Sequence, residues 1–150
     1  MIIGEVGLNH LGNEKYANDY INFHLKSDFE CLSFQIRENK FYKRQEKKHL
    51  ILNDSFYKKI VKKYSKIKDK KIGLSVSNIN SIRKIIKLKF DFYKILSIAA
   101  QNVKLINLLL EKTKADIYIS LGSLNLNEIN QIIKLYNSND RIKLNYTQLS

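Results

Sequence analysis

The chain opens with Ile2-Ile3-Gly4-Glu5-Val6-Gly7-Leu8-Asn9-His10, the stretch that decides the fold class. An apolar strand runs here into a polar turn. The turn contains neither G-x-G-x-x-G nor G-x-x-x-x-G-K, the Gly-rich patterns typical of nucleotide-binding α/β sheets. An acidic residue, Glu5, interrupts the apolar strand instead. The stretch therefore favours an α/β protein with a polar site at the end of its first strand.

Five more apolar segments follow this one, each succeeded by an amphipathic stretch. They are apolar at successive positions, which is typical of parallel strands buried on both faces. We predict six strands, at Ile2–Val6, Cys31–Ile36, Ile72–Val76, Phe90–Ile95, Asp116–Ser120 and Ile142–Tyr146.

Apolar residues three and four positions apart predict five helices between these strands. They lie at about Glu14–Leu25, after a capping Asp54, around Ile82–Ile86, after Asn102, and after Asn125 with Glu128 in a capping box. The charged stretch Arg37–Asn53 is irregular in sequence. It is either a linker or a loop that covers a site, and the sequence does not separate the two interpretations.

Polar residues stand at or near the carboxyl end of each predicted strand, namely Glu5, Gln35, Ser75, Lys94, Ser120 and Asn145. Barrel enzymes of the (β/α)8 type place their chemistry at these ends. Glu and Lys are rarely buried without a partner, so their presence on apolar strands indicates a site. The pattern predicts a partial TIM (β/α)8-type barrel of about six parallel strands alternating with five helices.

Composition narrows the class of protein. The 150 residues carry a formal charge of +13, but 23 of the 27 basic residues are Lys, and they are spread along the chain. Arg is the residue that recognises bases and binds phosphates through bidentate hydrogen bonds. Because most of the basic residues are Lys, we interpret the charge as a solvated surface and expect no nucleic-acid partner. The chain has one cysteine, no membrane-spanning apolar run and no leader pattern, so we expect a cytoplasmic protein.

Six segments, in order, carry a family resemblance: the opening stretch, Leu32-Ser33-Phe34-Gln35, Leu74-Ser75-Val76-Ser77, Tyr93-Lys94-Ile95-Leu96-Ser97, Ile119-Ser120-Leu121-Gly122-Ser123 and Leu144-Asn145-Tyr146-Thr147. Together they resemble the successive strand ends of sialic acid (N-acetylneuraminate) synthases. The resemblance implies one barrel domain over residues 1–150. It also implies condensation of phosphoenolpyruvate with an N-acetylated amino sugar, of the N-acetylmannosamine type, to a nonulosonic acid.

The resemblance assigns roles to particular residues. Glu5 and Lys94 are the candidate catalytic residues, because a carboxylate can orient a sugar hydroxyl or move a proton and an ammonium group can neutralise an anionic substrate. The candidate substrate-binding residues, which offer hydrogen bonds, are Asn9, His10, Gln35, Ser75, Ser97 and Ser120. The family also uses a divalent metal, manganese or magnesium.

The sequence departs from the family pattern at several of these positions. Ser33, Val76 and Ala99 replace a Lys, a Thr and a Glu, and Asn145 stands where the family has a metal-binding His, which puts the metal in doubt. We also expect the last two β/α units and the family's C-terminal antifreeze-like domain to be lacking. The open sheet edges then favour self-association or a completing chain. Two hypotheses stay open, an impaired synthase and a non-catalytic remnant that binds a ligand or supports assembly.

Overall fold

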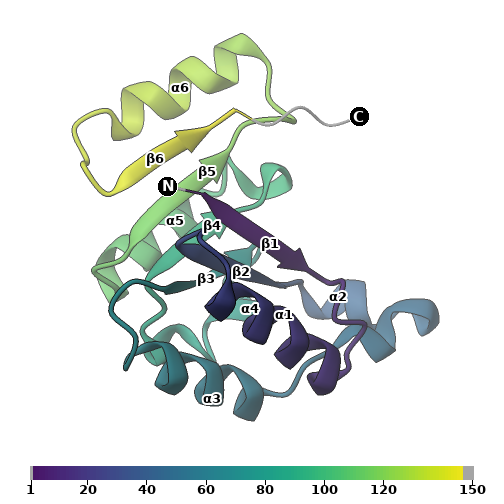
Figure 1. The fold of residues 1–150 in the computed structure, drawn as a ribbon. Coiled ribbons are helices and arrows are strands. Elements are labelled where there is room, and N and C mark those ends of the chain that lie inside the picture. Colours follow the sequence, from purple (N-terminus) through teal and green to yellow (C-terminus); the bar gives the residue numbers. More distant parts are fainter. Residues whose placement is uncertain (1, 147–150) are drawn as a thin grey trace.

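The computed structural model describes residues 2–146, which form one six-stranded parallel sheet in the order β1-β2-β3-β4-β5-β6 (Figure 1). The strands are β1 Ile3–Gly7, β2 Cys31–Ile36, β3 Lys71–Val76, β4 Phe92–Ile95, β5 Asp116–Ser120 and β6 Ile142–Asn145. All six predicted strands are present, with Phe90 and Tyr146 just outside β4 and β6. The sheet is not closed, since β1 and β6 are its two end strands.

Helices connect the successive strands. The α-helices are α1 Glu14–Lys26, α2 Asn39–Tyr42, α3 Asp54–Tyr64, α4 Ile79–Ile82, α5 Val103–Lys112 and α6 Leu126–Tyr136, and the 3-10 helices are η1 Gln45–Leu50, η2 Ile86–Leu88 and η3 Ser97–Ala99. Among residues 2–146, none of these helices has both the length and the apolar character that a bilayer crossing requires.

Helix α6 begins with the capping box that the sequence predicted. The Asn125 side chain accepts from the Glu128 N–H, and the Glu128 carboxylate accepts from the Asn125 N–H, which is a complete capping box. Asn102 likewise caps α5 through the Leu105 N–H. The predicted cap at Asp54 was wrong, because Asn53 takes the cap position and Asp54 is already helical. There its carboxylate faces the positive end of the helix dipole.

Two segments between strands differ from the prediction. Only a short α4 and the 3-10 turn η2 form where a full helix was expected around Ile82–Ile86. The backbone then turns left-handed at Lys89, with φ of 56°, which ends any helix. The stretch Arg37–Asn53, predicted to be irregular, contains α2 and η1. A side chain at Gly12 would overlap the His49 carbonyl, so this stretch lies directly on the turn after β1.

The main core lies between the sheet and the helices. Alternate strand residues such as Phe34, Leu74 and Ile119 pack there against helix residues such as Ile21 and Phe56, and all five are buried. This outer layer accounts for most of the buried apolar surface, and burial of that surface is the dominant favourable contribution to folding.

The other face of the sheet, which we call the inner face, carries a much smaller apolar cluster. Cys31, Phe92 and Tyr118 pack together there, with Ile3 beside them. The Phe92 and Tyr118 rings meet edge to face, with centroids 5.7 Å apart. Phe92 lies so close over Gly73 that any side chain there would overlap its ring. This aromatic cluster sits near the amino ends of the strands and leaves the remainder of the inner face to polar residues.

A charged and hydroxyl-rich candidate site on the inner face

Glu5 and Lys94 form an ion pair on the inner face. Lys94 Nζ donates to Glu5 Oε2 over 2.8 Å, and the two side chains are 21% (Lys94) and 33% (Glu5) exposed. Glu5 belongs to β1 and Lys94 to β4, which are three strand-to-strand steps apart. In a flat sheet, three steps of about 4.8 Å would separate the backbones by about 14 Å. The ion pair therefore requires a sheet that curls towards its inner face, as a barrel wall does.

Two buried serines extend this ion pair into a hydrogen-bonded chain. Ser75 Oγ donates to Glu5 Oε1 over 2.8 Å and lies 2.9 Å from Ser33 Oγ. Because Ser75 gives its only proton to Glu5, Ser33 is the donor in the second bond. Parallel register sets Ser75 beside Lys94 and Ser33 beside Glu5. The strand pairing thus holds the Glu5 carboxylate between a hydroxyl donor and an ammonium group.

The remaining strand-end candidates are not members of this hydrogen-bonded series of side chains. Gln35 pairs in register with Ser75, and its side chain is partly exposed. Ser97 begins η3, directly after β4, whereas Ser120 is the last residue of β5. Among residues 2–146, Ser120 Oγ is buried with no hydrogen-bond partner. Such a hydroxyl is costly to leave unsatisfied, and the Ser120 hydroxyl is able to donate a hydrogen bond.

Asn9 and His10 occupy the turn after β1 and behave differently from each other. Asn9 is exposed, and its backbone N–H donates to Val6. His10 is fully buried beside Phe34. Its Nδ1 accepts the Gly12 N–H over 2.9 Å, so the neutral ring carries its proton on Nε2, which has no partner in the described part of the chain. Burial lowers the pKa of His10 to about 4. His10 is therefore a neutral donor at pH 7, and it also shapes the turn.

A second charged cluster, which the sequence did not single out, follows the ends of β2 and β3. Ser77 Oγ donates to Glu38 Oε2 over 2.9 Å, and Arg37 Nε lies 3.3 Å from the same oxygen. The Arg37 guanidinium also sits 4.5 Å over the Phe41 ring. Burial alone would raise the pKa of Glu38, but its hydrogen bonds from Arg37, its own N–H and Ser77 lower it overall. The cluster adds a fixed carboxylate to the same rim.

His24 and His49 have no metal-like arrangement, and His24 is structural. Its Nδ1 lies 2.7 Å from the Tyr64 hydroxyl, and its Nε2 lies 3.1 Å from the Phe29 carbonyl. Burial, and then the charge of Lys70, lower its pKa. Because the Phe29 carbonyl can only accept, Nε2 carries the proton and Nδ1 accepts from Tyr64. The residue ties α1 to α3.

The divalent metal that the family resemblance predicts would need a set of converging ligand side chains. Within residues 2–146, no three side chains of His, Cys, Asp or Glu converge as metal ligands would. At the end of β6, Asn145 offers only an amide, which is a poor ligand for a transition metal.

The curled parallel sheet, with helices outside and charged groups inside, defines a barrel-type α/β domain. The NeuB family model matches residues 19–148, and the chain belongs to the NeuB family. The predicted family resemblance and fold class are confirmed. None of the curated proteins compared with the sequence matches it.

Two solved structures share the fold. N-acetylneuraminic acid (sialic acid) synthetase from Leptospira borgpetersenii serovar Hardjo-bovis, in complex with citrate, superposes with a TM-score of 0.82 at 19% identity, over 99% of this chain and 54% of its own. A Chromobacterium violaceum protein named for spore coat polysaccharide biosynthesis, protein E, gives 0.79 at 15% identity, over 99% and 49%. The chain thus spans about half the length of these relatives.

Proposed function

We propose that this chain is a domain of carbohydrate biosynthesis that binds phosphoenolpyruvate and an N-acetylated amino sugar, and that it supports their condensation to a nonulosonic acid at a reduced rate. Membership of the NeuB family and the likeness to a sialic acid synthetase support the substrate class. The observation that carries the proposal is the Glu5–Lys94 ion pair, held by Ser75 and Ser33 within a curled sheet.

Each group has a chemical task in this proposal. Lys94 neutralises the phosphate or carboxylate of phosphoenolpyruvate, and Ser120 donates a hydrogen bond to one of its oxygens. Ser75 holds the Glu5 carboxylate. Glu5 accepts a hydrogen bond from a sugar hydroxyl or takes up a proton as the new carbon–carbon bond forms. The anion must compete with Glu5 for Lys94, because the ammonium group is already paired.

That competition, together with Ser33 in place of the family's Lys, is the physical reason for a reduced rate. A phosphate and a carboxylate need more positive charge than one half-neutralised ammonium group supplies. Loss of a single transition-state contact costs on the order of a hundred- to a thousandfold in rate.

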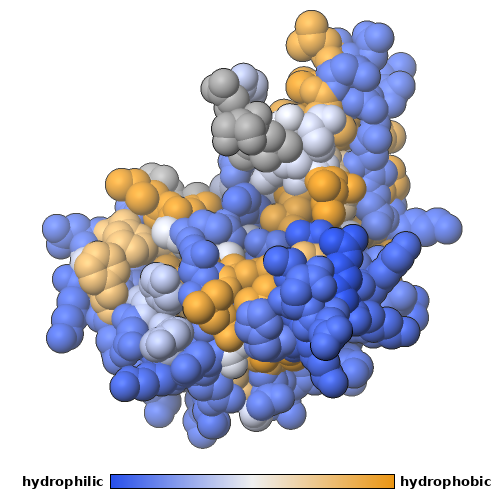
Figure 2. All heavy atoms as spheres, turned by 90° about the vertical axis from the view of Figure 1, so that its right-hand side faces the viewer, coloured by the Kyte–Doolittle hydropathy of each residue, from blue (hydrophilic) through white to orange (hydrophobic). Residues whose placement is uncertain are grey.

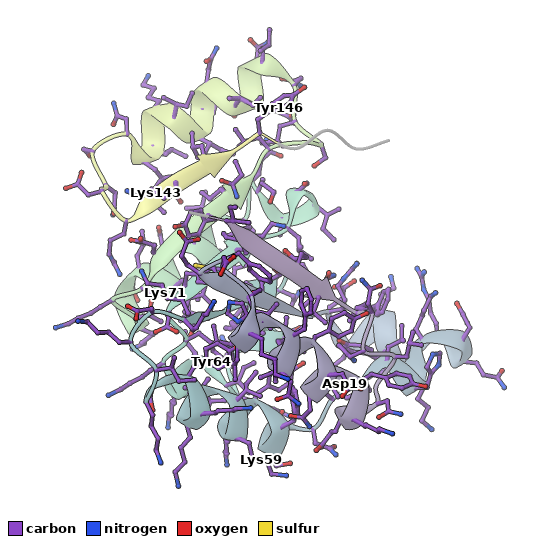
Figure 3. All side chains as sticks on the ribbon, viewed as in Figure 1. Asp19, Lys59, Tyr64, Lys71, Lys143 and Tyr146 are labelled. Carbon is purple, nitrogen blue, oxygen red and sulfur yellow. The ribbon has the colours of Figure 1, made fainter. Side chains whose placement is uncertain are left out.

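Calorimetric titration with phosphoenolpyruvate tests the proposal. Wild type binds the anion, Lys94→Ala does not, and Glu5→Gln binds more tightly because Lys94 is released from its partner. Lys71→Ala is the matched control, since Lys71 lies on the neighbouring strand at the opposite, amino end of the sheet (Figure 3). Absence of binding to wild type, or equal binding to Lys94→Ala, contradicts the proposal.

The departures at Ser33, Ala99 and Asn145 favour a second candidate, a non-catalytic remnant that binds without turnover. Phosphate release in the presence of phosphoenolpyruvate and N-acetylmannosamine separates the two functions. Release above background that Lys94→Ala abolishes supports the synthase. Binding with no release supports the remnant.

A further inference from the structure

A cavity of about 260 Å³ lies between the start of α3 and the segments that follow β2 and β3. Its walls come from three parts of the chain, with Arg37 after β2, Asp54 on α3 and Lys84 after α4. Ile36 also lines the cavity, and it packs against the main core between the sheet and the helices. The cavity therefore lies outside the sheet and is separate from the candidate site on the inner face.

The floor of this cavity is apolar, and its mouth is polar. Leu52 and Tyr57, on the floor, are buried members of the main core. Asp54 and Lys84, at the mouth, are exposed. Figure 2 views the side on which α2 projects in Figure 1, and it shows a hydrophilic surface with hydrophobic residues between the hydrophilic ones. Drug-sized ligands occupy about 300–1,000 Å³, so a site of this form and size fits a smaller metabolite.

Two cationic side chains at the cavity have donors to spare. Arg37 donates to Glu38 through Nε and Nη2, over 3.3 and 3.4 Å, while its Nη1 has no partner among residues 2–146. The Phe41 ring, 4.5 Å from the guanidinium carbon, holds that group in place. In the same part of the chain, the Lys84 ammonium group has neither an ion-pair nor a hydrogen-bond partner. A carboxylate is a ligand group that suits two such donors.

Asp54 and Tyr57 stand three residues apart on one face of α3, and both line the cavity. Tyr57 is 2% exposed, yet its hydroxyl has no hydrogen-bond partner within the described residues. Burial raises the pKa of Tyr57, and the nearby Tyr42 and Asp54 groups raise it further, so the phenol keeps its proton at pH 7. One hydroxyl group of a ligand can accept from Tyr57 and donate to the Asp54 carboxylate.

We propose that this cavity binds a small hydroxy acid with a single negative charge. The carboxylate of the ligand lies between Arg37 and Lys84, and its carbon atoms rest on the apolar floor. Its hydroxyl group lies between Tyr57 and Asp54.

The charges around the cavity favour one negative charge over two. Asp54 lines the same cavity, and Glu38 already neutralises part of the Arg37 charge. A phosphate ester carries a charge of about −1.5 to −2 at pH 7, so it is repelled more strongly than a carboxylate and is the poorer occupant.

Calorimetric titration of the full chain with glycerate, glycerol 3-phosphate and glycerol tests the proposal. These probes share a hydroxylated carbon chain and differ in carrying a carboxylate, a phosphate ester or no charge. Every titration uses protein with Lys94→Ala, which removes the ammonium group of the inner-face site, so the outcome is independent of phosphoenolpyruvate binding. Glycerate should bind about tenfold more tightly than glycerol 3-phosphate, and glycerol should not bind.

Two further variants and one matched control locate the site. Lys84→Gln should weaken glycerate binding about tenfold, because it removes a charged hydrogen bond. Arg83→Gln removes the same charge one residue away, outside the cavity, and should leave binding unchanged. Tyr57→Phe should weaken binding about fivefold without lowering the stability to urea, since its hydroxyl has no partner to lose.

Four outcomes overturn the proposal. They are absence of glycerate binding, equal binding of glycerol, a preference for glycerol 3-phosphate, and equal effects of Lys84→Gln and Arg83→Gln.

Discussion

On β2, Phe34 points into the layer between sheet and helices, whereas its neighbour Ser33 points to the inner face. Both residues are fully buried. Phe34 packs edge to face on Phe56 with ring centroids 5.5 Å apart, while Ser33 is one member of a hydrogen-bonded chain that ends at Lys94. The same strand therefore serves stability on one face and polar chemistry on the other. Burial alone does not distinguish the two roles.

The largest expected difference in unfolding free energy is between alanine substitutions on the two faces of β2. Phe34→Ala should lower the free energy of unfolding by about 3–5 kcal/mol, because it removes a buried ring and leaves a cavity. Ser33→Ala should cost only about 1 kcal/mol, since Ser75 keeps its bond to Glu5. Urea unfolding of both variants measures the difference. Equal losses would mean that the inner face contributes to stability as much as the outer core does.

Acid should destabilise the fold through His10, which lies in the turn after β1. The pKa of His10 falls from 6.5 to about 4 on folding, so between these values the unfolded chain binds the proton and the folded chain does not. Stability is therefore full above pH 6.5 and is lost as the pH falls towards 4, with a complete loss on the order of 3 kcal/mol. Urea midpoints across this range measure the effect.

The matched variant for the acid prediction is His10→Gln, which keeps an acceptor for the Gly12 N–H but does not titrate. Its unfolding free energy should depend less on pH than that of wild type. A residual slope is expected from His24, whose pKa is also lowered by burial. An unchanged slope in His10→Gln would show that the buried ring is not the acid-sensitive group.

The smallest expected effect concerns the ion pair itself. A double-mutant cycle with Glu5→Gln and Lys94→Met should give a coupling energy of about 1 kcal/mol or less, because both side chains are partly exposed to solvent. Added salt should reduce it further. A coupling of several kcal/mol would mean that the ion pair contributes substantially to the stability of the fold. It would weaken the case that the pair is kept for ligand binding.

The sequence predicted the strands well, because the parallel-sheet pattern of consecutive apolar residues is strong and local. It also predicted the capping box of Asn125 and Glu128, where the signal lies within four residues. It failed around Ile82–Ile86, where apolar spacing suggested a helix but the backbone turns left-handed at Lys89. Periodicity carries no information about such a turn.

The candidate site was predictable by strand position but not by connectivity. Glu5 and Lys94 stood out because charged residues rarely lie on buried strands, yet their contact depends on the curl of the sheet, which no local pattern encodes. Ser33 was interpreted only as the loss of a Lys, although its even spacing from Gln35 places the two side chains on one face. The Glu38–Arg37–Ser77 cluster gave no signal, because its members come from separate loops.

Gly73 on β3 carries a consequence for how molecules reach the inner face. The absent side chain is what lets the Phe92 ring lie flat across the strand and meet Tyr118. These rings cover the inner face near the amino ends of the strands and leave its polar part towards the rim where Glu38 and Ser77 lie. The missing side chain at Gly73 thereby makes room for the aromatic cluster that separates the polar part of the inner face from the amino ends of the strands.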